Sequence, residues 1–225
     1  MTAIENDPTV KGLVSTASDI KQKRGFLDFL EDVLSMPSSQ IQPLIRDSYY
    51  HKNGFSKLVL AGKELGPRIR IHYWNIKNAT QPFHSHTWNF SAIVLKGSLK
   101  IEEASICNFG GDLKLYNVPN RAARTNGATV FCETSNALII ERSPKIVENG
   151  NLHSLAVKKF HSVSCLTKEG AISLVLQGPH ESQCSKILMD SYVKLHDPYE
   201  VKYFSMKSYT NELREILEIL ETQYG

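Results

Sequence analysis

Hydrophobic residues near the N-terminus recur with the spacing of an amphipathic helix. Apolar side chains at i, i+3, i+4, i+7 and i+8 share one face: Phe26, Phe29, Leu30, Val33 and Leu34. The pair Met36-Pro37 ends this pattern, because proline cannot continue a helix. The sequence therefore predicts a helix that begins at Gly25.

Two further helices are predicted from similar patterns. The second is short and carries one apolar face of Ile41, Leu44, Ile45 and Tyr49. Ser39 and Gln42 have the spacing of a capping box at its start, and Pro43 is tolerated if it falls in the first turn. The third helix lies near the C-terminus, is introduced by Ser208 or Thr210, and has an apolar face of Leu213, Ile216, Leu217 and Leu220.

Between these helices, short β-rich runs alternate with turn residues such as Gly97, Gly110-Gly111 and Asn126-Gly127. The predicted strands are Phe55–Leu60, Arg68–Trp74, Ser91–Leu95, Ser98–Ile101, Lys114–Val118, Thr129–Cys132, Ala137–Arg142, Ser154–Lys159 and Ala171–Gln177. Many short strands without helical patterns between them favour an antiparallel sandwich or barrel. We expect one domain over residues 1–225, with a helical lead-in (1–50), a β-barrel (51–190) and a C-terminal extension with a helix (191–225).

Composition narrows the class of protein. The chain has 225 residues, of which 41% are hydrophobic and 22% charged, which is typical of a soluble globular protein. The 26 basic residues less the 23 acidic ones give a net charge of +3, too small to indicate a nucleic-acid partner. We find neither an apolar run that could span a membrane nor an export signal. The four cysteines form no CxxC pair, so we expect reduced thiols and a cytoplasmic protein.

The strongest chemical signal lies in the segment Pro82–Trp88, which contains His84 and His86. Residues at i and i+2 of a strand point to the same face, so both rings can reach one ion. Neutral imidazole suits Fe, Zn, Ni and Cu. The alternative is a surface pair that arises by accident among the eight histidines of the chain.

The surroundings of this pair resemble a cupin. The pair precedes the apolar run Phe90–Leu95 and the turn Lys96-Gly97-Ser98, and a distant His161 lies just before the apolar strand Ala171–Leu176. The resemblance implies a mainly β fold, a cupin jelly-roll β-barrel with N-terminal helices and a C-terminal helix. It also implies a metal site of His84, His86 and His161.

Three segments resemble the cysteine dioxygenase branch of the cupins in particular: Gly54–Val59, Ile71–Trp74 and Phe160–Pro179. This implies a mononuclear non-haem Fe(II) oxygenase that acts with O2 on a small anionic substrate. The departures concern substrate handling. Lys57 stands in place of the family's carboxylate-binding arginine, Gln177 in place of its active-site tyrosine, and Val175 in place of a histidine. Phe90 replaces the cysteine that cross-links to that tyrosine, so we expect no such cross-link. Because the substrate-handling groups are replaced, we expect a substrate other than free cysteine.

Five residues are the candidate substrate contacts: Lys57, Arg70, His72, Trp74 and Gln177. Arg68, Arg70, His72 and Trp74 alternate along one strand and share a face. If Trp74 faces the barrel interior, as the resemblance implies, His72 does too. A hydrogen-bonded interior histidine and a solvated Lys57 are the alternatives, and Arg70 is the rival anion-binding residue.

Other assignments stay open. His153 competes with His161 as third ligand, and we expect His51, His180 and His196 at the surface. Zn, Mn or Ni are alternatives to iron, which would make the protein a non-redox lyase or isomerase. A metal-free binding or structural cupin is the third possibility. The sequence predicts neither the natural substrate nor the oligomeric state.

Overall fold

The computed structural model describes residues 24–51, 54–62, 66–75, 80–119, 132–190 and 202–224. These residues form helices α2 (Arg24–Ser35), α3 (Ser38–Arg46) and α4 (Met206–Tyr224). Their strands are β1 (Tyr49–His51), β2 (Phe55–Gly62), β3 (Arg68–Trp74), β4 (Phe90–Lys96), β5 (Ser98–Cys107), β6 (Leu113–Pro119), β7 (Cys132–Glu148), β8 (Leu152–Leu155), β9 (Phe160–Cys165), β10 (Ala171–Gln177), β11 (Cys184–Asp190) and β12 (Lys202–Tyr203). None of the described helices is long and apolar enough to cross a membrane.

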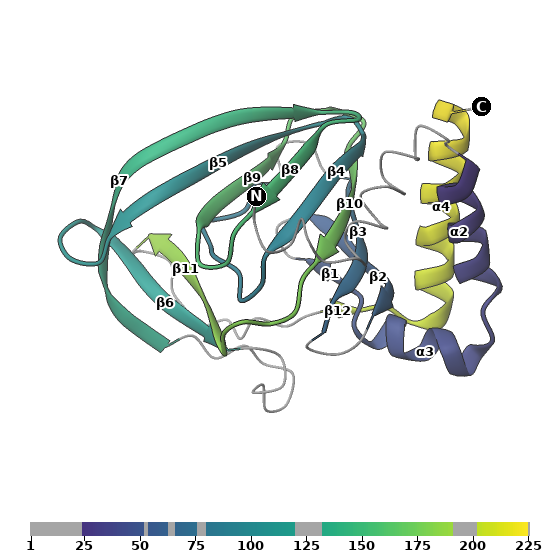
Figure 1. Ribbon diagram of the computed structural model, residues 1–225, viewed down its shortest axis with the longest axis horizontal. Helices are drawn as coiled ribbons and strands as arrows, with labels where there is room; N and C mark the ends of the chain where they lie inside the picture. Colours follow the sequence, from purple (N-terminus) through teal and green to yellow (C-terminus); the bar gives the residue numbers. More distant parts are fainter. Residues whose placement is uncertain are drawn as a thin grey trace.

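The strands form two antiparallel sheets, with orders β12-β1-β2-β3-β10-β4-β8 and β11-β6-β7-β5-β9 (Figure 1). Residues 80–86 act as one more strand, because they bridge to β9 and to β11. With this strand included, β3-β10-β4-β8 faces 80–86, β9, β5 and β7. That is the strand order of an eight-stranded jelly roll, so the predicted mainly β, cupin-type fold is confirmed.

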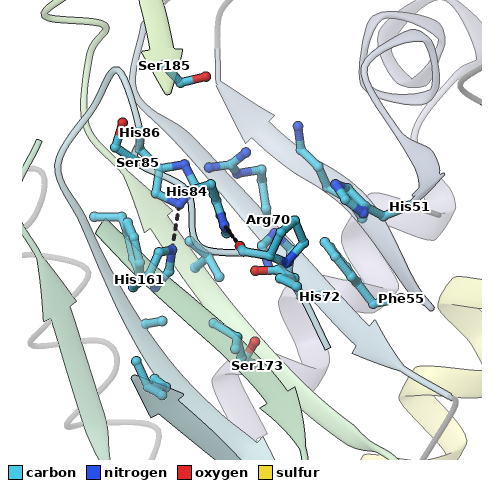
Figure 2. Close-up of a pocket in the computed structure, with 18 of the residues that line it drawn as sticks. His51, Phe55, Arg70, His72, His84, Ser85, His86, His161, Ser173 and Ser185 are labelled. Carbon is cyan, nitrogen blue, oxygen red and sulfur yellow. Dashed lines mark hydrogen bonds between the residues drawn. The ribbon is translucent and has the colours of Figure 1, made fainter. Parts of the chain in front are cut away.

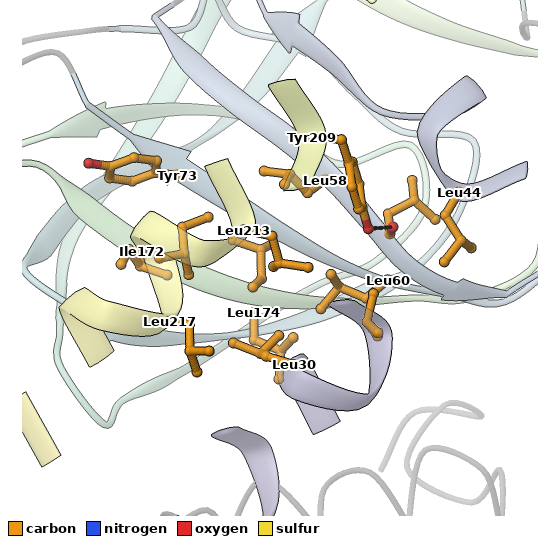
Figure 3. Packing of buried hydrophobic residues seen from close by; sticks show 14 of the residues in the cluster. Leu30, Leu44, Leu58, Leu60, Tyr73, Ile172, Leu174, Tyr209, Leu213 and Leu217 are labelled. Carbon is orange, nitrogen blue, oxygen red and sulfur yellow. Dashed lines mark hydrogen bonds between the residues drawn. The ribbon is translucent and has the colours of Figure 1, made fainter. Parts of the chain in front are cut away.

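The helices cover one face of the larger sheet, on the right in Figure 1. Figure 3 shows Leu213 and Leu217 of α4 packed with Leu30 of α2 against the sheet. Tyr209 of α4 is fully buried, and its hydroxyl donates a 2.7 Å hydrogen bond to the Val59 carbonyl. The helices therefore bury the outer face of the sheet, which leaves its inner face to line the barrel.

The alternation predicted for β3 is present. Ile71 and Tyr73 belong to the core under the helices, whereas Arg70, His72 and Trp74 line a cavity on the opposite side. Because successive residues of a strand point to opposite faces, one strand supplies both the helix-packing core and the interior of the barrel.

Two predictions about helix ends are wrong. Helix α3 begins after Pro37 without any side-chain cap, so Ser39 forms no capping box and Pro43 lies beyond the first turn. Tyr49 lies in β1, outside this helix. Helix α4 is capped by Ser205, because the Ser208 N–H donates to the Ser205 hydroxyl at 3.1 Å and the Ser205 N–H to that of Ser208 at 2.9 Å.

Several strands differ from their predicted bounds. The predicted strand Ala137–Arg142 is the middle of β7, which has 17 residues. The predicted strand Ser154–Lys159 stops at Leu155, and the chain then turns through Lys158, which has a φ of 67°. Strands β9 and β11 were not predicted, because their serines and lysine hide the apolar pattern. Of the predicted strand Thr129–Cys132, only Cys132 lies among the described residues.

Gly170 provides a test of this architecture. It has a φ of +83°, and a Cβ there would collide with the carbonyl oxygen of Trp74 at the end of β3. Gly150 has a φ of +81° but open space around the same position. We expect Gly150→Ala to destabilise the fold by about 1–2 kcal/mol through backbone strain alone. Gly170→Ala should lower the free energy of unfolding by about 1–3 kcal/mol more than Gly150→Ala does, because of the collision with Trp74.

Urea unfolding followed by circular dichroism measures the difference. Equal losses for the two variants would contradict the close approach of Gly170 to Trp74.

Candidate metal centre

The segment 80–86 is held along both of its edges. On one edge, the His84 N–H donates to the His161 carbonyl and the His161 N–H donates to the His84 carbonyl, both at 2.9 Å. On the other edge, the Ser85 N–H donates to the Lys186 carbonyl at 2.8 Å, and the Lys186 N–H donates to the Ser85 hydroxyl at 3.0 Å. Pairing on both edges holds this segment in place, and the His84 and His86 side chains both line the cavity inside the barrel.

Three histidine rings converge there (Figure 2). One ligand nitrogen from each of His84, His86 and His161 lies within 4.8 Å of the other two. The Nε2 atoms of His86 and His161 are 3.0 Å apart. Two nitrogens bound at right angles to one ion, at about 2.1 Å each, also lie about 3.0 Å apart. Neighbouring nitrogens on a tetrahedral or octahedral ion lie about 3.0–3.4 Å apart, so a pair near the 4.8 Å limit must close by more than about 1 Å on binding.

The protonation of these rings fits a ligand role. The His84 Nδ1–H donates to the Pro82 carbonyl at 2.9 Å, which leaves the Nε2 lone pair free for an ion. Burial lowers the pKa of all three histidines, well below the usual value for His86 and His161. Neutral imidazoles are the form that binds Fe, Zn, Ni or Cu. The residues present therefore fit a divalent metal ion.

The three rings stand at the wall of a cavity of about 240 Å³. One side is an aromatic wall, in which Phe55 stacks on His51 with ring centres 4.4 Å apart and on Trp74 at 4.5 Å. Apolar side chains of β5 and β9 also line the cavity, among them Leu99, Ile101 and Val163. Such a cavity leaves room for a small molecule beside the three rings.

The charged residues of the cavity are all basic. Lys57 and Arg70 are only 8% and 4% exposed, and Lys186 also lines the space. Among the described lining residues there is no aspartate, glutamate or cysteine. The Lys57 ammonium lies 4.6 Å from the centre of the Tyr49 ring, and the Arg70 guanidinium lies 5.0 Å from that of Trp88. The interior is therefore a positively charged space that attracts anions.

Most buried polar side-chain atoms without a hydrogen-bond partner are found at this cavity. In the described part of the chain they are Arg70 Nε, His72 Nε2, Trp74 Nε1, Trp88 Nε1, both ring nitrogens of His153, His161 Nδ1 and Gln177 Nε2. All of these residues except Gln177 line the cavity. An unsatisfied buried polar group costs about 1–3 kcal/mol, so a polar occupant has several partners to gain.

The structure places the predicted site residues as follows. His84, His86 and His161 lie together, and Lys57, Arg70, His72 and Trp74 surround the same cavity. Gln177 is buried but does not line the cavity, where Val175 of the same strand does. His153 also lines the cavity, outside the cluster of three rings.

The surface assignment of His51 is wrong, whereas His180 is half-buried and does not line the cavity. His51 lines the cavity, and His180 accepts or donates a 2.8 Å hydrogen bond with the Thr87 hydroxyl and lies against the Trp88 ring. The turn signal Asn53-Gly54 offered a means of finding His51, since a hairpin there places His51 opposite Phe55. His196 lies outside the described residues.

The chain is similar to several solved structures at low sequence identity. The cupin domain of Schizosaccharomyces pombe Cnp3 is 9% identical, with a match over 56% of this chain and 61% of that chain and a TM-score of 0.35. KdgF from Halomonas sp. is 9% identical over 60% and 90% of the two chains, with a TM-score of 0.36. An oxalate oxidase is 14% identical over 78% and 74%, with a TM-score of 0.39. These similarities carry no information on ligand or reaction. No protein-family model matches the chain, and no curated protein sequence does either.

The three-histidine cluster leads to a direct prediction. Purified protein loaded with Co(II) or Zn(II) should hold one divalent ion per chain, measured by elemental analysis after removal of free metal. His84→Ala and His161→Ala should each abolish stoichiometric binding, because two imidazoles are a poor site for either ion. His153→Ala is the matched control, since it removes a buried cavity histidine from outside the cluster. Loss of metal in His153→Ala together with full retention in His161→Ala would show that the third ligand is His153.

Proposed function

We propose that this protein is a mononuclear non-haem iron oxygenase that acts with O2 on a small anionic substrate. One observation supports this above the others: three neutral imidazoles converge at the wall of a cavity whose charged residues are all basic. With no carboxylate ligand beside them, the donor set carries no charge of its own. The site is therefore suited to an anion that approaches the metal directly.

In this proposal the ion is held by His84, His86 and His161. When bound, iron would supply the redox chemistry and the activation of O2. The chain itself supplies binding and enclosure. Arg70 and Lys57 attract the anion, while Phe55 and Trp74 shield the reacting groups from bulk water. His72, with a pKa held well below its usual value by burial, offers a neutral hydrogen-bonding ring to the substrate.

Oxygen uptake tests the proposal. Protein purified anaerobically and loaded with Fe(II) should consume O2 with at least one member of a panel of small anionic thiols and carboxylates. Zn(II)-loaded protein and the Fe(II)-treated His84→Ala variant should consume none, because the first lacks redox chemistry and the second lacks the site. Turnover of a substrate by the Zn(II) form without O2 would instead establish a non-redox lyase or isomerase.

We further propose a relationship to thiol dioxygenases with a substrate other than free cysteine. Val175 packs with Phe90 and Leu155 in an apolar cluster. In the family that the chain resembles, a histidine stands at the place of Val175 and a cysteine at that of Phe90. Apolar side chains there cannot position or deprotonate an amino acid. The thiol chemistry would then serve a substrate that lacks the ammonium group.

Free cysteine should accordingly be a poor substrate. Each missing contact to a charged group is worth about 1.5–3 kcal/mol, so two or three missing contacts lower kcat/KM by several powers of ten. The kcat/KM for cysteine is compared with that for 3-mercaptopropionate, which has the thiol and the carboxylate without the ammonium group. Efficient conversion of cysteine to its sulfinic acid, followed by mass spectrometry, would refute this part of the proposal.

A further inference from the structure

Arg70 is a buried cation for which the described residues provide no anionic partner. Its side chain is only 4% exposed, its Nε has no hydrogen-bond partner, and no described carboxylate pairs with it. Burial lowers its pKa only to about 10, so the guanidinium stays charged at neutral pH. An uncompensated buried charge is costly, and proteins normally neutralise it with an anion.

The neighbouring cations are held differently. Arg68, two residues earlier on β3, forms a 2.8 Å ion pair with Asp47 and does not line the cavity. The Lys57 ammonium lies over the Tyr49 ring and 3.5 Å from the Tyr49 hydroxyl. Of these three cations, Arg70 is thus the one for which the described residues provide only an aromatic face, that of Trp88. Lys186, the other cation that lines the cavity, is less buried than Arg70 and can be solvated.

Its position relates it to the metal centre. The guanidinium lies 5.0 Å from the centre of the Trp88 ring, and that ring lies 5.0 Å from the ring of His86. Figure 2 shows the Arg70 side chain pointing into the space beside His84 and His86. An anion bound to Arg70 therefore lies next to the three-histidine cluster.

We propose that Arg70, rather than Lys57, binds the carboxylate of the substrate, and that this substrate carries an apolar body. This inference rests on the proposed function for the position of the substrate. A planar guanidinium binds a carboxylate through two parallel hydrogen bonds, which an ammonium cannot do. Its stacking on Trp88 fixes the plane in which that pair forms.

The apolar body follows from the lining beyond Arg70. The residues of β3 that line the cavity become less polar along the strand, from Arg70 through His72 to Trp74. The Trp74 side chain is only 1% exposed. Trp74 belongs to an apolar cluster with Leu99, Ile101 and Val163, all of which line the cavity. A molecule with its carboxylate at Arg70 thus has mainly apolar side chains around the rest of its atoms, which disfavours a second charged group there. His72 Nε2 and Trp74 Nε1 are the unpartnered polar atoms on this strand and can each meet one hydrogen-bonding group of that molecule.

The two tryptophans make this inference measurable. The chain has two tryptophans, Trp74 and Trp88, and both line the cavity. Fluorescence excited selectively in the tryptophans, at wavelengths where the nine tyrosines do not absorb, therefore reports on this space. We would titrate the full chain, both metal-free and Zn(II)-loaded, with benzoate and with benzamide, which has the same shape but no charge. Benzoate should change the fluorescence and bind at least 10-fold more tightly than benzamide in both forms.

The variants assign the charge. Arg70→Gln should weaken benzoate binding at least 10-fold and leave benzamide unchanged, whereas Arg70→Lys should recover part of the loss as a point charge. Lys100→Gln is the control, because it removes one positive charge from a residue of β5 that does not line the cavity. This variant should bind benzoate with the same affinity as the unmodified chain. Thermal unfolding of each variant checks the fold, and Arg70→Lys carries the test if Arg70→Gln does not fold.

The outcomes separate this inference from the proposed function. Equal affinity for benzoate and benzamide, or full benzoate affinity in the Arg70 variants, would overturn it. A loss confined to Lys57→Gln would assign the carboxylate to Lys57 and overturn it too. If benzoate binds through Arg70 but Fe(II) protein consumes no O2 with any substrate, the oxygenase proposal fails while the anion site stands.

Discussion

The backbone pairing of His84 with His161 is the constraint on which the rest of the site depends. Its two hydrogen bonds join the strand 80–86 to β9. This pairing brings the rings of His86 and His161 together, although these residues are 75 positions apart in the sequence. Strand pairing fixes the spacing of side chains to within a fraction of an ångström, which loops rarely achieve. Since β11 holds the opposite edge of 80–86, the convergence of the rings is a property of the barrel itself.

The alternation of side chains along a strand connects this centre to the helices. Strand β3 has Ile71 and Tyr73 in the core under the helices, and Arg70 and His72 in the cavity. Burial of the apolar face by α2 and α4 therefore supplies the free energy that holds costly polar groups in place on the other face. Tyr73 adds to this link, because its hydroxyl donates to Glu215 of α4 at 2.8 Å. The packing of the helices outside the barrel and the charged groups inside it thus depend on the same strand, β3.

Much of this arrangement could be predicted from local patterns. The period-two alternation of Arg68–Trp74 and the apolar run Ala171–Gln177 match β3 and β10 residue for residue. The spacing of His84 and His86 indicated one shared face. What failed depends on partners that are distant in sequence. Strand β9 is recognisable only through its pairing with β5 and 80–86, and the place of His51 depends on the β1–β2 hairpin. Gln177 lies two residues after Val175 and so belongs to the same face of β10, but the cavity ends before it. The extent of a cavity cannot be predicted from a local sequence pattern.

Electrostatics explains why a cluster of neutral ligands and a buried arginine occur in one cavity. A divalent ion on three imidazoles and the Arg70 guanidinium repel each other, and among the described lining residues no carboxylate offsets either charge. An anion between them is attracted by both and reduces the cost of burying each. Binding of the ion and binding of the anion should therefore strengthen each other by the same factor, because linkage between two sites is reciprocal. In the proposed function the interior of the barrel holds both, and the unpartnered nitrogens along its walls are the groups available to the anion.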